Sequence, residues 1–349
     1  MKKYSLGCTL KIPAEKRKLL NKKLSRKSSR IRHLGDPRIL AVLDRSYLFD
    51  PGRTLTVAFK GGGYSLQYDI ARWAKEWELH ANIKFDFGHD SEKQKFRSWS
   101  RKNKKKKADI RISFESNEVN NGYWSAIGND IDFVDDNGEA FYPAHEPTMN
   151  YADLRSRKPD KQRAFVLHEF GHALGFMHEH QSPSGDCDKE FRWEDDKGYN
   201  PNFNETDGYL PDDQGRNPGI FTVMENPPYS WTREAVEENM KMFKDENAYE
   251  QSKFDKYSIM KYYYEPWMYK KGEASPCYSK EENMELSLHD KKAAQSAYPF
   301  QSAAVKDIAV KKKIDLQTLL NARKLTKPEK AVVNETIAEH ERNHAHLLK

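Results

Sequence analysis

The sequence predicts an α+β fold, in which a twisted mixed sheet and a long helix are followed by a mostly irregular C-terminal subdomain. Two observations indicate this class. Segments with strand and helix patterns follow one another in the order strand, helix, strand, strand, and a helix that contains histidines comes next. Beyond residue 184 the chain becomes polar, acidic and rich in Asn, Gly and Pro, which is typical of irregular structure.

Alternation of apolar and polar residues predicts strands at 55–59, 83–87 and 109–114. Apolar side chains at helical spacing predict an amphipathic helix over residues 65–80. Residues 101–107 carry six positive charges, which predicts an exposed loop between two strands. The stretches 122–128 and 147–151 are extended in character and complete the elements that precede the histidine-rich helix.

That helix contains the pattern His168-Glu169-x-x-His172-x-x-Gly175-x-x-His178. Two histidines four residues apart lie on the same face of a helix, so both can reach a single zinc ion. Glycine at position 175 lets the chain leave the helix through a backbone region that other residues adopt at a cost, which brings the third histidine round to the same metal. Glu169 follows the first ligand and is placed to act on a zinc-bound water. The alternative, a helix of structural histidines, has to explain three of them and a glycine at ligand spacing.

The chain beyond this pattern is less regular. Residues 184–254 form a polar insertion, whose clearest helix is predicted at 232–243 behind a Thr cap. Oxygen-bearing side chains over 195–215 leave a calcium site open as an alternative, although no loop with fixed ligand positions is present. Residues 286–290 begin a helix that closes the main domain, residues 50–300. A helical tail is expected over residues 301–349.

The N-terminal segment is strongly basic. Residues 1–33 carry twelve Lys or Arg against Glu15 alone, whereas residues 34–349 are net acidic. Residues 1–49 are therefore either a solvated basic arm or a pro-segment. Beyond Tyr4 no aromatic residues are interleaved among the charges, which argues against nucleic-acid binding, although an arm that binds nucleic acid or an anionic surface stays an alternative.

Cysteine usage and hydropathy limit the other classes of protein. Cys8, Cys187 and Cys277 allow at most one disulfide and one free thiol, which is not a disulfide framework. No apolar run approaches the roughly 20 residues that cross a bilayer. A standard signal peptide is absent, so we expect a protein that is cytoplasmic or exported by a non-standard route. We also favour a monomer.

A second His-Glu-x-x-His pattern occurs in the tail, at His340 and His344. Only five residues follow it, and its neighbours are charged where an active-site helix needs an apolar face. We therefore expect a surface helix there, without catalytic function.

The extended pattern at 168–178, followed by Glu179, resembles the astacin family of zinc endopeptidases within the metzincin clan. Ser258-Ile259-Met260-Lys261-Tyr262 is similar to the family's Ser-x-Met-x-Tyr turn. The resemblance covers roughly residues 50–300 and implies a metzincin-like fold with an active-site helix. It also implies that Met260 forms the floor under the zinc and that Tyr262 is a switchable fifth ligand. Residues 122–128 are similar to the edge strand along which these enzymes pair an extended substrate.

The sequence also departs from that family. His180-Gln181-Ser182-Pro183 replaces the usual run of Arg and Asp, and the paired disulfides of the family are missing. In the family, the glutamate at the position of Glu179 is linked to a processed N-terminus, which leaves its role here open. Leu34-Gly35-Asp36 resembles the inhibitory Gly-Asp of the pro-segments, and Cys8 is a second candidate inhibitory ligand. Both can equally be ordinary residues of a basic arm.

We therefore expect one catalytic Zn²⁺ ion and a protein or peptide substrate. Glu169 is the expected general base, and Tyr262 is expected to stabilise the oxyanion. The alternative is a catalytically silent protein whose fold is stabilised by zinc.

Overall fold

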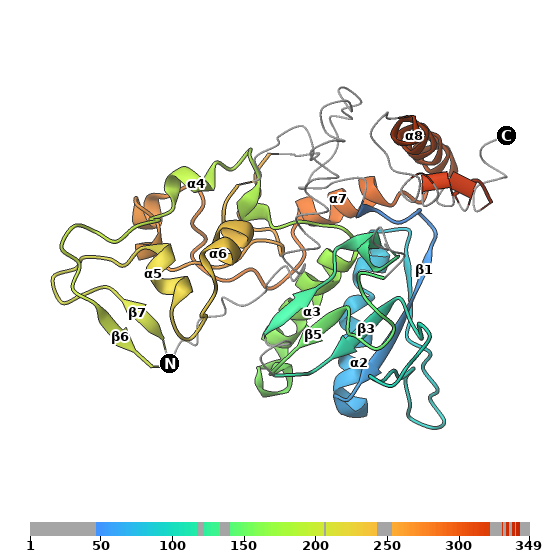
Figure 1. Ribbon diagram of the computed structural model, residues 1–349, viewed down its shortest axis with the longest axis horizontal. Coiled ribbons are helices and arrows are strands. Elements are labelled where there is room, and N and C mark those ends of the chain that lie inside the picture. The colour runs from blue at the N-terminus through green and yellow to red at the C-terminus, as the bar shows by residue number, and fades with distance from the viewer. Residues whose placement is uncertain are drawn as a thin grey trace.

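The computed structural model describes residues 47–116, 122–132, 140–205, 207–242 and 253–321, with positions 330, 333–334, 337–338 and 340–342 of the tail. Figure 1 shows one half with the sheet, α2 and α3, and a second half with α4, α5, α6 and the β6–β7 pair. Cys8 and Asp36 lie outside the described residues, so the expectation of a pro-segment stays a prediction.

A five-stranded mixed sheet forms one layer of the first half. Its strands are β1 (Thr54–Lys60), β2 (Lys84–Asp86), β3 (Ile110–Ser113), β4 (Tyr123–Ser125) and β5 (Met149–Tyr151). The order across the sheet is β2-β1-β3-β5-β4, and neighbours from β2 to β5 run parallel. β4 pairs antiparallel with β5, with Trp124 opposite Asn150. The predicted mixed sheet is confirmed, and the stretch predicted as an edge strand contains β4 at one end of the sheet.

Two helices, α2 (Gly63–Ala74) and α3 (Pro159–Ala173), contact each other in the first half. Their apolar side chains and those of the sheet form one buried core. The predicted helix over 65–80 is wrong at its end, because α2 ends at Ala74 and Trp77 opens the short 3-10 turn η2 (Trp77–Leu79). Trp77 donates a hydrogen bond to the Leu167 carbonyl at 3.0 Å and stacks on Phe176, so packing against α3 overrides the helical pattern.

Further 3-10 turns connect these elements to α3. They are η3 (Gly128–Asp132) after β4 and η4 (Leu154–Ser156) after β5. The basic run at 101–107 lies in a loop whose charged side chains are all exposed, as predicted.

The second half consists of short elements joined by irregular chain, as the sequence predicts. They are η5 (Glu179–Gln181), α4 (Cys187–Glu190), β6 (Asn202–Asn204), β7 (Gly208–Leu210), α5 (Ile220–Glu225), α6 (Arg233–Met240), η6 (Pro266–Met268) and η7 (Gly272–Ala274). Thr232 caps α6 by accepting a hydrogen bond from the Ala235 amide, as expected from the sequence. Aromatic side chains dominate the core of this half, which is separate from the core around the sheet.

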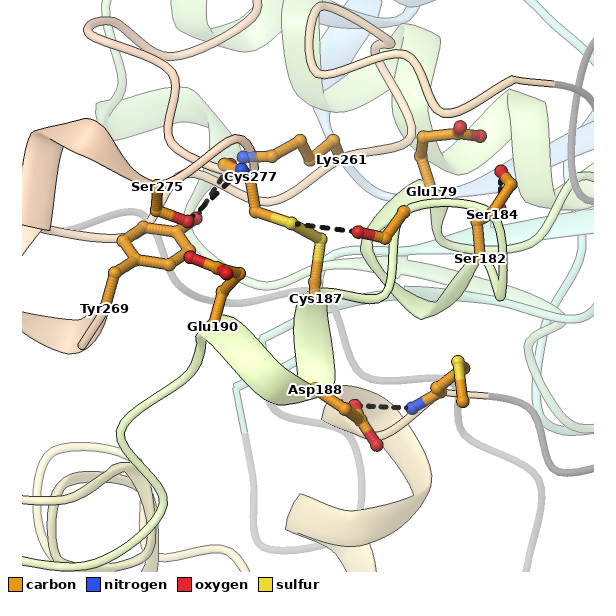
Figure 2. Close-up of a disulfide and its surroundings, with 12 residues drawn as sticks. Glu179, Ser182, Ser184, Cys187, Asp188, Glu190, Lys261, Tyr269, Ser275 and Cys277 are labelled. Atoms are coloured by element: carbon orange, nitrogen blue, oxygen red, sulfur yellow. Dashed lines mark hydrogen bonds between the residues drawn. A yellow bond between two sulfur atoms is a disulfide. The ribbon is translucent and has the colours of Figure 1, made fainter. Parts of the chain in front are cut away.

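One disulfide crosses the second half. Cys187 on α4 is bonded to Cys277, which lies 90 residues further along the chain (Figure 2). Both sulfurs lie in the buried core that also contains Tyr262 and Tyr269. This bond is the one pair that three cysteines allow, and it encloses α4, α5 and α6.

Two helices follow near the end of the described chain. α7 (Leu288–Ala297) begins with a capping box between Ser287 and Asp290, and α8 (Ser302–Leu320) confirms helical structure in the tail. Within the part of the chain that the structure describes, no helix is long and apolar enough to cross a membrane.

Candidate metal centre and active site

The last two turns of α3 carry the first two candidate ligands inside the molecule. Pro159 occupies the first turn of the helix, where its missing N–H costs no intrahelical hydrogen bond. From Val166 to Ala173 every residue of the helix is buried. Polar side chains in so apolar a position require partners, because burial removes their contact with water.

Three histidine side chains converge at the end of this helix. The Nε2 atom of His172 lies 3.1 Å from that of His168 and 3.0 Å from that of His178. Such separations are close to the roughly 3.3 Å that Zn–N bonds of about 2.0–2.1 Å give in a tetrahedral site. Among the residues that the structure describes, these three form the one cluster of His, Cys, Asp or Glu able to hold a metal.

The other ring nitrogen of each histidine faces an oxygen acceptor. Nδ1 of His168 lies 2.7 Å from the Ile259 carbonyl, and Nδ1 of His172 lies 2.7 Å from the Phe176 carbonyl. Nδ1 of His178 lies 3.2 Å from Oε1 of Gln181. Since each Nδ1 donates its proton to an oxygen, each Nε2 keeps its lone pair for a metal.

Burial also keeps the three imidazoles neutral. It lowers the pKa of His168 to about 4 and lowers the pKa values of His172 and His178 well below the ordinary value. A ligand histidine must be neutral to bind a cation, so the donor set, its tautomers and its charge all fit zinc.

Gly175 turns the chain out of α3 toward the third histidine. Its φ is +94°, a left-handed conformation that other residues adopt at a cost, and its amide donates to the His172 carbonyl at 2.8 Å. The turn explains how a ligand six residues beyond His172 reaches the same point.

The two predicted catalytic side chains lie in the same region. Glu169 is fully buried and is the sequence neighbour of a ligand. The ring of Tyr262 is almost fully buried and its centroid lies 4.3 Å from that of His178 and 5.7 Å from that of His168. The structure therefore brings together the three predicted ligands and the ring of Tyr262, and it buries Glu169 in the same turn of α3 as His168 and His172.

Met260 contacts α3 at Gly171, between the first two candidate ligands. A Cβ atom added at Gly171 would lie 2.4 Å from the Met260 sulfur. The turn that contains Met260 is held by the carboxylate of Asp290 at the start of α7. That carboxylate accepts hydrogen bonds from the Ser258 hydroxyl at 2.6 Å and the Ile259 amide at 2.8 Å.

Glu179, whose role the sequence leaves open, binds the same turn. Its amide donates to the Met260 carbonyl at 3.1 Å, and its Oε1 accepts from the Asp255 amide at 2.9 Å. Burial raises the pKa of Glu179 well above its usual value, and the carboxylates of Asp290 and Asp255 add to the shift. Glu179 thus ties the segment after the third histidine to the chain that leads into the methionine turn.

Two residues next to the histidines, His180 and Gln181, were not predicted from the sequence. The ring of His180 stacks on that of His178 at 5.0 Å, and its Nε2 lies 2.9 Å from the Asn239 carbonyl. Burial lowers the pKa of His180 to about 3. Their one signal in the sequence is the departure from the family pattern that begins directly after Glu179.

Two other candidate sites from the sequence are the second His-Glu-x-x-His pattern, at His340, and the stretch considered for calcium. His340 is buried, and its Nε2 lies 2.8 Å from the Ala309 carbonyl of α8, so the expectation of a surface helix is wrong at this position. In the stretch considered for calcium, carboxylates accept hydrogen bonds from the protein. Asp212 accepts from the amides of Asn200 and Arg216, and Asp195 accepts from the amide of Gly219.

Comparisons with known proteins bear on the fold. No protein-family model matches the sequence, and no curated protein is similar to it. A structure of myroilysin is 23% identical, with a TM-score of 0.51, over 75% of this chain and all of that one. A second myroilysin structure is 21% identical over 73% of this chain and 86% of that one, with a TM-score of 0.43. A hatching enzyme zinc-protease of the medaka fish Oryzias latipes is 15% identical over 73% of this chain and 96% of that one, with a TM-score of 0.39. The chain therefore has the fold of myroilysin, which agrees with the fold that the astacin-like resemblance implies.

Proposed function

We propose that this chain is a zinc-dependent endopeptidase of the astacin type, with His168, His172 and His178 as the ligands of one catalytic zinc ion. The observation that carries the proposal is the convergence of three Nε2 atoms, each on a ring whose Nδ1 faces an oxygen. A buried carboxylate, Glu169, is adjacent in sequence to the first ligand. This combination supplies a metal site and, one residue after its first ligand, a candidate base.

When bound, zinc lowers the pKa of a water ligand toward ~7 and polarises a peptide carbonyl. Glu169 accepts the proton of the attacking water and delivers it to the departing amine nitrogen. Tyr262, whose ring packs on that of His178, donates a hydrogen bond to the oxyanion.

The sheet supports a peptide as the substrate class. β4 lies at one end of the strand order, and its antiparallel pairing with β5 uses one side of its backbone. No strand of the described residues pairs with its other side, where an extended peptide would be added as a further strand.

The competing proposal is a silent protein that uses zinc for stability alone. The presence of both Glu169 and Tyr262 argues against it, since neither is needed to hold the metal. The decisive experiment incubates the protein with a peptide library, with and without a chelator, and identifies cleavage sites by mass spectrometry. We expect cleavage that the chelator abolishes and added zinc restores. A protein that binds zinc stoichiometrically and cleaves no peptide would overturn the proposal.

A further inference from the structure

The C-terminal end of α6 contacts the segment that carries the third histidine. The last carbonyl groups of a helix have no partner within it and need donors from elsewhere. Nε2 of Gln181 donates to the carbonyls of Glu238 at 2.8 Å and Lys241 at 2.9 Å. His180 contacts the carbonyl between them, that of Asn239, at 2.9 Å. Two side chains directly after the ligand therefore satisfy three carbonyls at the end of this helix.

Gln181 also contacts the ligand itself. Its Oε1 lies 3.2 Å from Nδ1 of His178, and its side chain is almost completely buried. The amide orientation follows from the partners, because two carbonyl oxygens require the NH₂ group on one side and the ring N–H requires the oxygen on the other. His168 and His172 have backbone carbonyls at the corresponding ring nitrogen, whereas His178 has this side chain.

We propose that Gln181 is a positioning residue for the metal site: it fixes the tautomer and orientation of His178, and α6 fixes Gln181. The inference rests on the proposed zinc site and deepens it. It gives the polar insertion between the histidine motif and the methionine turn a role in metal binding. The carbonyls of α6 hold the amide by its nitrogen, so that its oxygen is directed at the ligand ring.

The alternative is that Gln181 merely caps α6, and substitutions separate the two roles. Gln181→Met keeps the approximate length but removes both the acceptor and the donors. Gln181→Glu keeps an acceptor for Nδ1 of His178, yet places a carboxylate against two carbonyl oxygens. The apo protein should therefore lose more stability with Glu than with Met, whereas zinc affinity should fall more with Met than with Glu.

A matched control exists at the other end of α3. Nε2 of Gln162 also donates to two backbone carbonyls, those of Leu154 and Arg157, each at 3.0 Å. Neither of these carbonyls belongs to a proposed ligand histidine. Gln162→Met thus removes the same kind of side chain and the same number of carbonyl contacts.

The test measures zinc affinity by competition with a chromophoric chelator and apo stability by thermal unfolding, on the full chain. We expect Gln181→Met to bind zinc about 10–100-fold more weakly than wild type. Gln181→Glu and Gln162→Met should stay within about threefold of it. The visible spectrum of the cobalt-substituted protein should change in Gln181→Met and not in Gln162→Met, because only the former loses an orienting contact to a ligand.

Two results would overturn the inference. One is a Gln181→Met variant with wild-type zinc affinity and cobalt spectrum. The other is zinc affinity that follows apo stability, with the Glu variant the weaker binder, which is the outcome expected of a helix cap alone. Failure of wild type itself to bind zinc would refute the proposed function instead, so the two failures are distinguishable.

Discussion

Met260 and Gly171 are in direct contact, although 89 positions separate them in the sequence: a methyl group added to the glycine would lie 2.4 Å from the methionine sulfur. The glycine lies within α3, between the two proposed ligands His168 and His172. The helix that carries these ligands therefore rests on the methionine turn without an intervening side chain.

Gly171→Ala should destabilise the protein by about 1–3 kcal/mol, because the added methyl has no space next to the Met260 sulfur. In a helix without such a clash, the same substitution would stabilise the protein. Urea unfolding of the apo protein measures the change. In a Gly171→Ala/Met260→Ala double variant the clash with the sulfur is removed and only the closer approach to Trp77, at 3.2 Å, remains, so the two losses should be clearly less than additive. Additive losses would mean that the contact does not limit the approach of the helix.

Glu169→Ala should keep one zinc per chain and lose about 10²–10⁴-fold in kcat, because the base is removed while all three ligands remain. Metal content by atomic absorption and peptide cleavage measure the two effects. His172→Ala is the comparison and should lose the metal itself. Undiminished cleavage by the Glu169 variant would refute its assignment as the base.

Tyr262→Phe keeps the ring that packs on His178 and removes only the hydroxyl. If the hydroxyl stabilises the oxyanion, kcat should fall by about 10²–10³-fold while KM changes little. Steady-state kinetics on one cleaved peptide separate the two constants. A rise in KM at constant kcat would assign the hydroxyl to substrate binding in the ground state.

Replacing Cys187 and Cys277 by alanine together should lower the free energy of unfolding by about 2–4 kcal/mol, because the bond closes a long loop in the unfolded chain. Denaturant unfolding measures the loss. Wild type unfolded in the presence of a reductant should show a similar loss, and the alanine variant should not respond to the reductant. An equal response of both proteins would place the effect elsewhere.

The contribution of Glu115 to the free energy of unfolding should depend on pH. The hydrogen-bonded guanidinium of Arg101 and the ammonium of Lys60 lower its pKa to about 2. An acid whose pKa is lowered on folding stabilises above its unfolded value near 4.5, and this stability is lost as the pH falls toward 2. Glu115→Gln should cost about 1–2 kcal/mol at pH 7, since both cations are partly solvated, and this cost should fall below pH 4.5 and become small near pH 2. A cost independent of pH would contradict this.

Local patterns made much of the site predictable. The spacing of His168, His172 and His178 depends on helix geometry and one glycine, and both are encoded within eleven residues. The positions of Met260 and Tyr262 followed from a family resemblance. The α6 contact could not be predicted in this way, because its acceptors are backbone carbonyls, which every residue has.

The errors of prediction have the same physical origin. Trp77 fits the helical pattern, but its hydrogen bond to α3 requires the chain to leave the helix first. His340 has charged neighbours, yet it is buried against Ala309 of α8 and lies 3.4 Å from the Asp50 carboxylate. Both side chains are positioned by residues that are far away in the sequence. A pattern read over a short stretch around Trp77 or His340 does not include those residues.

The hydrogen bond from His168 to the Ile259 carbonyl also dictates the order of events during synthesis. A nascent chain that has emerged as far as residue 181 contains the three ligands, the base and Gln181, but it lacks the acceptor that orients the first ligand. The helix end that anchors Gln181 is translated some sixty residues later, and the methionine turn follows it. With the proposed zinc site, full metal affinity therefore requires the chain to have emerged at least as far as Ile259.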